Sequence, residues 1–307
     1  MNPIRSVLIT GANAGLGREC ARQLSAIESI EKIILACRSG AKADAAKAEL
    51  QAETGRDVFE TLLMDVMDPG SVRDAVVQLT APVDAVILNA GGMGGTDPTG
   101  MTPRGVTNIF AVNVQGHVAL VDQLLERQLI TSTILYAGSE AARGIPKMGV
   151  APPTLDMSSE TEISSVATGR GFAADADPLE VYGTVKLTAA MWMASMARQN
   201  PAIRFVTISP GGTTGTNGMD DLPFLKRLFF KHVGGILMPL LGMMHDLETG
   251  ARRYVEVLTN PKFESGRFYA SRAGSPTGPV VDQTTIQPDF GNPVYQDNVN
   301  RAVHQFV

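Results

Sequence analysis

Short apolar runs alternate with amphipathic stretches along most of this chain of 307 residues. The apolar runs are rich in β-branched residues, which is typical of strands buried on both faces. They predict strands at 4–9, 32–36, 58–64, 83–88, 131–136, 203–208 and 267–270. The stretches between them follow a helical period and predict helices at 15–27, 41–53, 69–79, 105–127, 180–199 and 246–259.

Strands and helices that alternate along one chain predict an α/β fold. We expect a doubly wound parallel sheet of about seven strands, a Rossmann fold, with right-handed crossovers and helices on both faces. No linker, repeat or low-complexity tract divides the sequence, so residues 1–307 are predicted to form a single domain. Ligands bind such sheets at the carboxyl ends of the strands, and the chemistry is expected there.

Composition narrows the possible partners. The net charge is −5 and no dense Lys/Arg run occurs, which argues against nucleic acid. Only Cys20 and Cys37 are present, so we expect a cytoplasmic protein without a structural disulfide. We expect no signal peptide before the first strand, and the longest uncharged apolar run, 233–244, is too short and too glycine-broken to span a bilayer. No metal site is predicted.

A glycine-rich turn separates the first predicted strand from the first predicted helix. Glycines at 11, 15 and 17 permit a sharp turn and a close approach of the backbone to a pyrophosphate. The helix that follows presents free N–H groups and its positive dipole end to the phosphates. An ordinary glycine-rich connection is the alternative. The residues expected to contact a nucleotide are Gly11, Asn13, Ala14, Gly15, Leu16 and Gly17.

The end of the second predicted strand indicates the type of nucleotide. Sheets that bind NAD usually carry an acidic residue there, whereas this chain has Arg38. A guanidinium suits a 2′-phosphate, so we predict NADP(H), although a solvated surface arginine is the alternative. Asp65, beside Val66 after the third strand, would accept a hydrogen bond from the adenine amino group or would cap the helix near Pro69.

Tyr182 and Lys186 lie four positions apart in a predicted helix, so their side chains share one face. A nearby ammonium favours phenolate, and we expect it to lower the pKa of Tyr182 toward neutrality, where a general acid or base is useful. Alone, the pair is weak evidence for chemistry, because a helix with a snorkelling lysine has the same spacing.

Together these segments resemble the short-chain dehydrogenase/reductase family from the first strand to about residue 216. The family's motifs are matched in order by residues 10–17, Asn89-Ala90-Gly91, Asn113, Ser139, Tyr182 with Lys186, and Pro210-Gly211. The sequence at 9–17, 35–38 and 113–117 most resembles that of the retinol dehydrogenase and protochlorophyllide reductase branch, which uses NADP(H).

The resemblance implies a mechanism and a set of roles. Hydride would pass between nicotinamide and a substrate carbon while Tyr182 gives or takes the proton. Ser139 would hold the substrate oxygen, and Lys186 would lower the tyrosine pKa and bind the nicotinamide ribose. Asn113 would hold a water that links Lys186 to solvent. Further cofactor contacts are implied for Asp65, Val66, Asn89, Ala90, Gly91, Tyr182, Pro210, Gly211, Thr213 and Thr214.

Two departures from the family pattern concern spacing. Ser139 and Tyr182 are separated by far more residues than is usual, and the extra segment, 141–177, is rich in Pro, Gly, Ser and Thr, so we predict a loop-like insertion. It would block the helix face used for dimerisation or form part of the substrate wall, so a monomer and a small homo-oligomer both stay open. After Pro210 the threonine spacing is shifted, which leaves Thr214 and Thr216 as rival cofactor ligands.

A segment rich in Met, Leu and Phe interrupts the alternation, and the predicted substrate lid spans 213–245. It suits a lipophilic ketone, aldehyde or alcohol, and basic residues beside phenylalanines at 219–245 suit contact with a membrane surface. A core-facing helix pair is the alternative. The leading prediction is an NADP(H)-dependent oxidoreductase. Its rivals are a catalytically silent nucleotide-binding sensor or scaffold and a sugar-nucleotide epimerase or dehydratase.

Overall fold

The computed structural model describes residues 3–156, 158–215 and 242–307. Most of the predicted lid, including Thr216, lies outside these residues. No helix within the described ranges combines the length and the apolar character needed to cross a membrane.

A sheet of eight strands in the order β3-β2-β1-β4-β5-β6-β7-β8 forms the centre of the described structure. The strands are β1 Ser6–Thr10, β2 Lys32–Cys37, β3 Phe59–Leu63, β4 Val83–Leu88, β5 Ile130–Ala137, β6 Arg204–Ile208, β7 Arg267–Ser271 and β8 Val280–Asp282. The first seven pair in parallel, as predicted. The expectation of about seven strands missed β8, which pairs antiparallel with β7 after a short return of the chain. A strand of three residues carries too little periodicity to be recognised.

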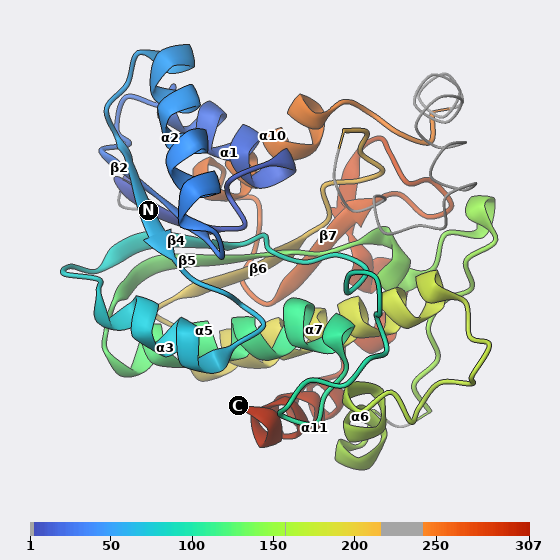
Figure 1. Cartoon of the computed structure of the whole chain (residues 1–307). Helices are drawn as coiled ribbons and strands as arrows, with labels where there is room; N and C mark the ends of the chain where they lie inside the picture. The colour runs from blue at the N-terminus through green and yellow to red at the C-terminus, as the bar shows by residue number, and fades with distance from the viewer. Residues whose placement is uncertain (1–2, 157, 216–241) are drawn as a thin grey trace.

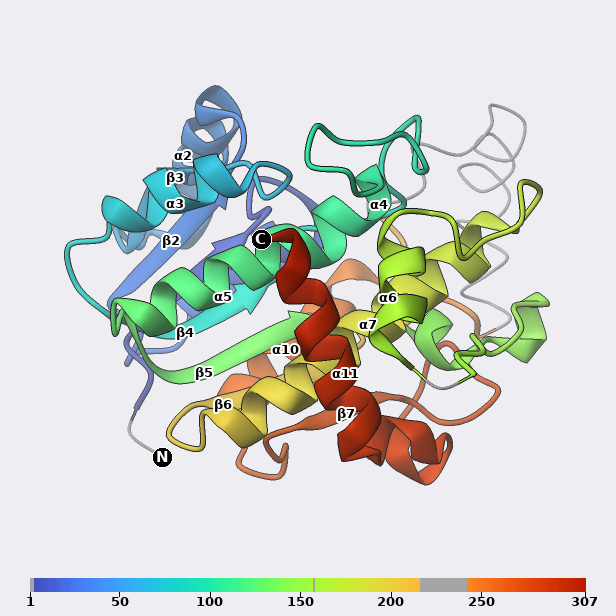
Figure 2. The same cartoon turned by 90° about the horizontal axis from the view of Figure 1, so that it is seen from below.

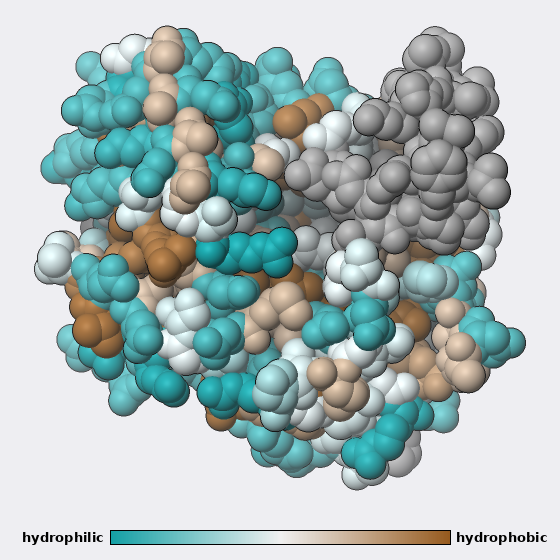
Figure 3. Space-filling model, viewed as in Figure 1, coloured by the Kyte–Doolittle hydropathy of each residue, from teal (hydrophilic) through white to brown (hydrophobic). Residues whose placement is uncertain are grey.

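Helices cover both faces of the sheet (Figure 1). On one face lie α1 Gly15–Ser25, α2 Gly40–Thr54 and α10 Leu247–Thr259, over a core that includes Ile9, Leu35 and Tyr254. On the other lie α3 Pro69–Val77, α5 Gly116–Glu126 and α7 Pro178–Gln199, over a second core. The surface over α1 and α2 is largely hydrophilic (Figure 3).

The single helix predicted at 105–127 is divided. A short helix, α4 Asn108–Phe110, is followed by a π-helical turn, η1 Ala111–Gln115, before α5 begins. At the junction, a Cβ on Gly116 would lie 1.6 Å from the Val66 carbonyl oxygen. Only glycine therefore allows this helix to approach the loop after β3 so closely.

Residues 141–177 were predicted to form a loop-like insertion, but part of this segment is helical. They contain α6 Glu160–Ala167 and the 3₁₀ turn η3 Pro146–Met148, and η2 Glu140–Arg143 begins one residue earlier. The sequence pattern also missed α11 Pro293–Val303 and the 3₁₀ turns η6 Gln283–Thr285, η7 Pro288–Gly291 and η8 His304–Phe306.

The C-terminal helix α11 lies against α7 and α6 (Figure 2). The Ser195 hydroxyl of α7 donates to the Asp297 carboxylate at 2.6 Å, and the same carboxylate pairs with Arg198. Beyond α11, the Phe306 carbonyl accepts from the Gln115 amide at 2.6 Å. These contacts join the last residues to the middle of the chain.

Candidate active site

The glycine-rich turn after β1 has the backbone form that a phosphate cradle needs. Gly11 and Gly15 have φ of 66° and 54°, the left-handed region that favours glycine. A Cβ on Gly17 would lie 2.7 Å from the Gly11 carbonyl oxygen, so the turn closes only with glycine there. Ala14 precedes α1 and gives it no side-chain cap. The first N–H groups of α1 therefore remain suited to an anion, and the residues fit a dinucleotide.

The loop after β4 is fastened to this turn. The Asn89 amide donates to the Thr10 carbonyl at 2.9 Å, and the Ala90 N–H donates to the Thr10 hydroxyl at 2.9 Å. These bonds hold the predicted residues Asn89, Ala90 and Gly91 beside the glycine turn. The Asn89 side chain thus helps to fix the shape of the glycine-rich turn.

Arg38 is exposed directly after β2, and its guanidinium pairs with no carboxylate in the described part of the chain. Asp65 lies half-buried after β3, where its carboxylate accepts from the Met67 N–H at 3.0 Å. The alternative that Asp65 caps the next helix is wrong, because Asp68 is the N-cap of α3 and accepts from Gly70. Val66 is buried beside Asp65.

Three of the four predicted catalytic residues come together where β5 ends against α7. Ser139 is the N-cap of the 3₁₀ turn after β5, and its hydroxyl lies close enough to the Tyr182 phenol to lower the pKa of that phenol. Lys186, one turn further along α7, is 3% exposed, and its Nζ lies 5.6 Å from the centroid of the Tyr182 ring. A hydroxyl, a phenol and an ammonium thus share one site.

Asn113, the fourth predicted catalytic residue, lies in the π-helical turn η1 and is fully buried. Its side-chain amide donates to the Gly92 carbonyl at 2.8 Å, which holds the loop after β4. The main-chain carbonyl of Asn113 accepts from the Tyr136 hydroxyl at 2.9 Å. Lys186 Nζ donates to that hydroxyl at 3.0 Å and to the Ala137 carbonyl at 2.8 Å. A protein hydroxyl thus links the lysine to the asparagine. That Asn113 holds a water linking Lys186 to solvent stays a prediction.

The expected effect of Lys186 on Tyr182 is wrong for this structure. Burial raises the pKa of Tyr182 to about 12 and outweighs the lowering by the Ser139 hydrogen bond. Burial lowers the pKa of Lys186 to about 7, because the ammonium is desolvated and its acceptors are neutral. Tyr182 therefore keeps its proton at neutral pH, and Lys186 titrates there.

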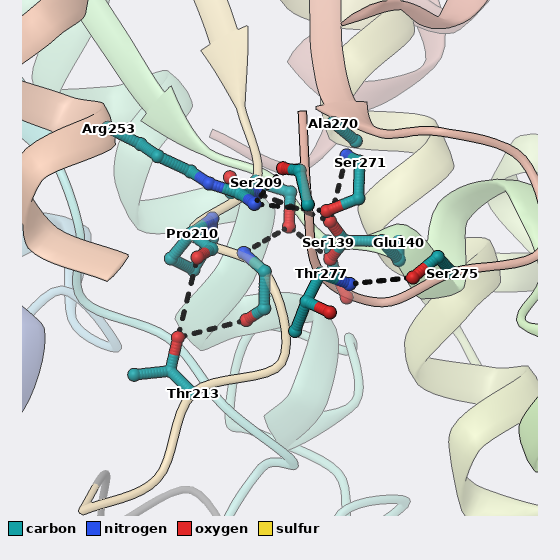
Figure 4. A network of polar contacts seen from close by, with 12 residues as sticks. Ser139, Glu140, Ser209, Pro210, Thr213, Arg253, Ala270, Ser271, Ser275 and Thr277 are labelled. Atoms are coloured by element: carbon teal, nitrogen blue, oxygen red, sulfur yellow. Dashed lines mark hydrogen bonds and ion pairs between the residues drawn. The ribbon is translucent and has the colours of Figure 1, made fainter. Parts of the chain in front are cut away.

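A buried group of charges lies behind Ser139 (Figure 4). Glu140 is 3% exposed and forms an ion pair at 3.6 Å with Arg253 of α10, which is 6% exposed. The Glu140 carboxylate also accepts from the Ser209 hydroxyl and from the Ser271 N–H. Strands β5, β6 and β7 therefore meet at one carboxylate.

A second arginine extends this group. Arg143 is 5% exposed and donates from one nitrogen to the carbonyls of Ser271, Arg272 and Ser275, at 2.9, 2.9 and 3.0 Å. The loop after β7 is thereby held against the turn that carries Ser139. Burial lowers the pKa of both Arg143 and Arg253.

The loop after β6 contains the remaining predicted cofactor residues. The Pro210 carbonyl accepts from the His245 ring at 2.7 Å, and the Thr213 hydroxyl donates to the Gly211 carbonyl at 3.0 Å. The Thr214 hydroxyl donates to the His245 carbonyl at 3.2 Å. Both described threonine hydroxyls are thus engaged by backbone, and the loop is set by internal bonds.

Sequence reasoning missed Tyr136, Glu140, Arg143 and Arg253. Tyr136 stands three residues before Ser139 in a predicted strand, and Glu140 follows Ser139 directly. Proximity to a motif serine was the only available signal for these two. Arg253 lies in a predicted helix, where a charged residue is ordinarily exposed to solvent. No pattern in the sequence indicates that it is buried.

The sequence is similar to known short-chain dehydrogenases. A family model described as short chain dehydrogenase matches residues 5–150. The short chain dehydrogenase rstn4 of Aspergillus nomiae is 34% identical over 142 residues, which cover 45% of this chain and 38% of that protein. Retinol dehydrogenase 12 of Homo sapiens is 28% identical over 215 residues, 68% of this chain and 61% of that protein. The chain thus spans less than two thirds of either relative.

Solved structures share the fold. A structure of an uncharacterized protein from Mycobacterium paratuberculosis has a TM-score of 0.70 and 21% identity, and the match covers 98% of this chain and 92% of that one. A short chain dehydrogenase from Burkholderia cenocepacia in complex with NADP has a TM-score of 0.57 and 18% identity, over 83% and 90% of the two chains. A Brucella melitensis 3-ketoacyl-(acyl-carrier-protein) reductase complexed with NADH has a TM-score of 0.56 and 18% identity, over 84% and 91%.

Proposed function

Since the chain belongs to the short-chain dehydrogenase/reductase family, and within it to a branch like that of the retinol dehydrogenases, we propose that it transfers hydride between NADP(H) and a carbonyl or alcohol carbon. The observation that carries this proposal is the meeting of Ser139, Tyr182 and Lys186 where β5 ends against α7. When bound, the nicotinamide supplies or accepts the hydride.

The proton is the part of the reaction that the protein's own residues would handle. A phenol with a pKa of about 12 holds its proton at neutral pH, so Tyr182 suits donation to an oxygen that becomes an alkoxide. This favours the reductive direction. Ser139, whose hydroxyl lies beside the phenol, would hold the same oxygen and align it. Lys186 would bind the ribose with the N–H that its two acceptors leave over.

The preference for NADP(H) is supported by Arg38. Its exposed guanidinium stands at the carboxyl end of β2, where a 2′-phosphate would lie beside the glycine turn. A carboxylate at that place would repel the phosphate, and this chain has none. The Burkholderia relative complexed with NADP gives a precedent within the fold.

A lipophilic substrate is proposed from the sequence of the lid segment and from a relative's name. Retinol dehydrogenase 12 is named for a lipophilic alcohol. Residues 219–244 are rich in Met, Leu and Phe, which suit an apolar ligand. We also propose a cytoplasmic protein, since Cys20 and Cys37 are buried free thiols.

Steady-state oxidation of NADPH with a panel of carbonyl compounds tests the proposal. Hydrophobic aldehydes or ketones are expected to be reduced, and Tyr182→Phe is expected to abolish turnover while NADPH still binds. Tyr269→Phe is the matched control, because its hydroxyl accepts from the Glu264 N–H at 2.9 Å, away from the site. Binding of NADPH without turnover of any carbonyl would identify a sensor, and turnover by Tyr182→Phe would refute the assigned proton donor.

A further inference from the structure

Tyr136 lies beneath the site without belonging to the motifs that define it. Its side chain leaves β5 on the face covered by α5 and α7 and is fully buried. The hydroxyl accepts from Lys186 Nζ at 3.0 Å and donates to the Asn113 carbonyl at 2.9 Å. One phenol therefore joins two of the four predicted catalytic residues.

The Asn113 carbonyl has a second partner. His117 Nδ1 lies 3.3 Å from the same oxygen, and its Nε2 lies 3.4 Å from the Thr10 hydroxyl. Burial, followed by the charge of Lys186, lowers the pKa of His117 to about 3, so the ring is neutral at physiological pH. The bonding network assigns the proton to Nδ1, which then donates to Asn113. Because a carbonyl oxygen has two lone pairs, Tyr136 and His117 together saturate it.

We propose that Tyr136 is a positioning residue for hydride transfer: its hydroxyl fixes Lys186 Nζ beside Tyr182 and ends the hydrogen-bond chain at the Asn113 carbonyl. The inference rests on the proposed function. It assigns to the Tyr136 side chain the link between Lys186 and Asn113.

The chain of bonds cannot carry a proton onward. The Tyr136 hydroxyl donates to a carbonyl, and a carbonyl has no proton to pass on. Burial raises the pKa of Tyr136 well above its ordinary value, so this phenol stays protonated. This chain of hydrogen bonds therefore supplies no proton to Tyr182.

The same bonds hold the ammonium in register. Lys186 donates two of its three N–H groups to acceptors of β5, which are Tyr136 Oη and the Ala137 carbonyl. A Cβ on Gly91 would lie 3.4 Å from Nζ, so the ammonium lies close to the loop after β4. The titratable groups that face Nζ are Tyr182 of α7, Tyr136 of β5 and His117 of α5.

The experiment compares Tyr136→Phe with Tyr269→Phe. Both remove one phenol hydroxyl from a tyrosine of the sheet, and only the first touches Lys186. The pKa of Lys186 is read from ¹⁵N NMR of lysine Nζ, assigned with Lys186→Arg, and needs no turnover. Loss of a neutral acceptor disfavours the ammonium, so Tyr136→Phe should lower this pKa by about one. The kcat for carbonyl reduction should fall about tenfold, and its dependence on Lys186 ionisation should move to lower pH by the same amount.

Three results would overturn the inference. One is a Lys186 pKa and a kcat in Tyr136→Phe that match those in Tyr269→Phe, which would make Tyr136 merely structural. Another is recovery of Tyr136→Phe activity by added imidazole or methylamine, which would show a proton path through Tyr136. The third is absence of wild-type turnover with every carbonyl. That result refutes the proposed function itself, and it is distinguished by a Lys186 pKa that still falls in the variant.

Discussion

Replacement of Arg253 by methionine tests whether the buried charges behind Ser139 act as one unit. In the native protein the Arg253 guanidinium donates to the Ser209 carbonyl at 3.0 Å, to the Ser271 hydroxyl at 3.1 Å and to the Gly278 carbonyl at 3.0 Å. It also pairs with Glu140 at 3.6 Å. Arg253→Met keeps most of the side-chain volume and removes every one of these donors.

The expected loss follows from what remains. Glu140 would stay buried with only the Ser209 hydroxyl and the Ser271 N–H as donors, and the Ser209 carbonyl would lose its arginine partner. Breaking a buried pair on one side costs about 3–5 kcal/mol of unfolding free energy. The neighbouring Arg252 offers a matched control on the same helix, because it is exposed and pairs with Glu248 at 2.7 Å. Arg252→Met should cost about 0.3–0.5 kcal/mol.

Urea unfolding of the two variants and of the double variant Glu140→Gln/Arg253→Met measures these differences. The double variant should recover part of the loss, because a neutral amide no longer leaves a charge buried alone. Equal midpoints for Arg253→Met and Arg252→Met would refute the reasoning. So would a double variant less stable than Arg253→Met, since the penalty would then not reside in the unpaired carboxylate.

Further outcomes are expected at other sites. Arg38→Ala should raise the KM for NADPH at least tenfold and leave the KM for NADH nearly unchanged, and steady-state kinetics with each cofactor would reject the 2′-phosphate contact if both rise equally. Gly116→Ala should prevent stable folding, because its Cβ would meet the Val66 carbonyl oxygen, and a wild-type thermal unfolding curve would contradict this. The Asp122 carboxylate raises the pKa of His304 above its ordinary value of 6.5, so the stability it adds is full below that value and is lost as pH rises through the folded pKa. The difference in unfolding free energy between wild type and His304→Gln should therefore shrink as pH rises above 6.5, and a difference that grows would refute the assigned ion pair.

The parallel sheet was predictable because each buried strand carries a continuous apolar run that needs no partner to be recognised. Tyr182 and Lys186 were predictable because their chemistry requires a fixed spacing on one helix. The pKa of Tyr182 was not, because desolvation depends on everything that surrounds the phenol and a sequence shows only its neighbour Lys186. Arg253 shows the same limit, since its carboxylate partner lies on an element more than a hundred positions earlier in the chain.

The packing of α11 against α7 has a consequence for folding during synthesis. Ser195 and Asp297 bond across 102 positions, and Gln115 and Phe306 across 191. During synthesis the side of α7 that packs against α11 therefore stays uncovered until α11 has been translated. Until α11 packs, apolar surface stays exposed in the nascent chain, which promotes aggregation or chaperone binding. The folding of α7, which carries Tyr182 and Lys186, thus depends on a helix translated about a hundred positions later.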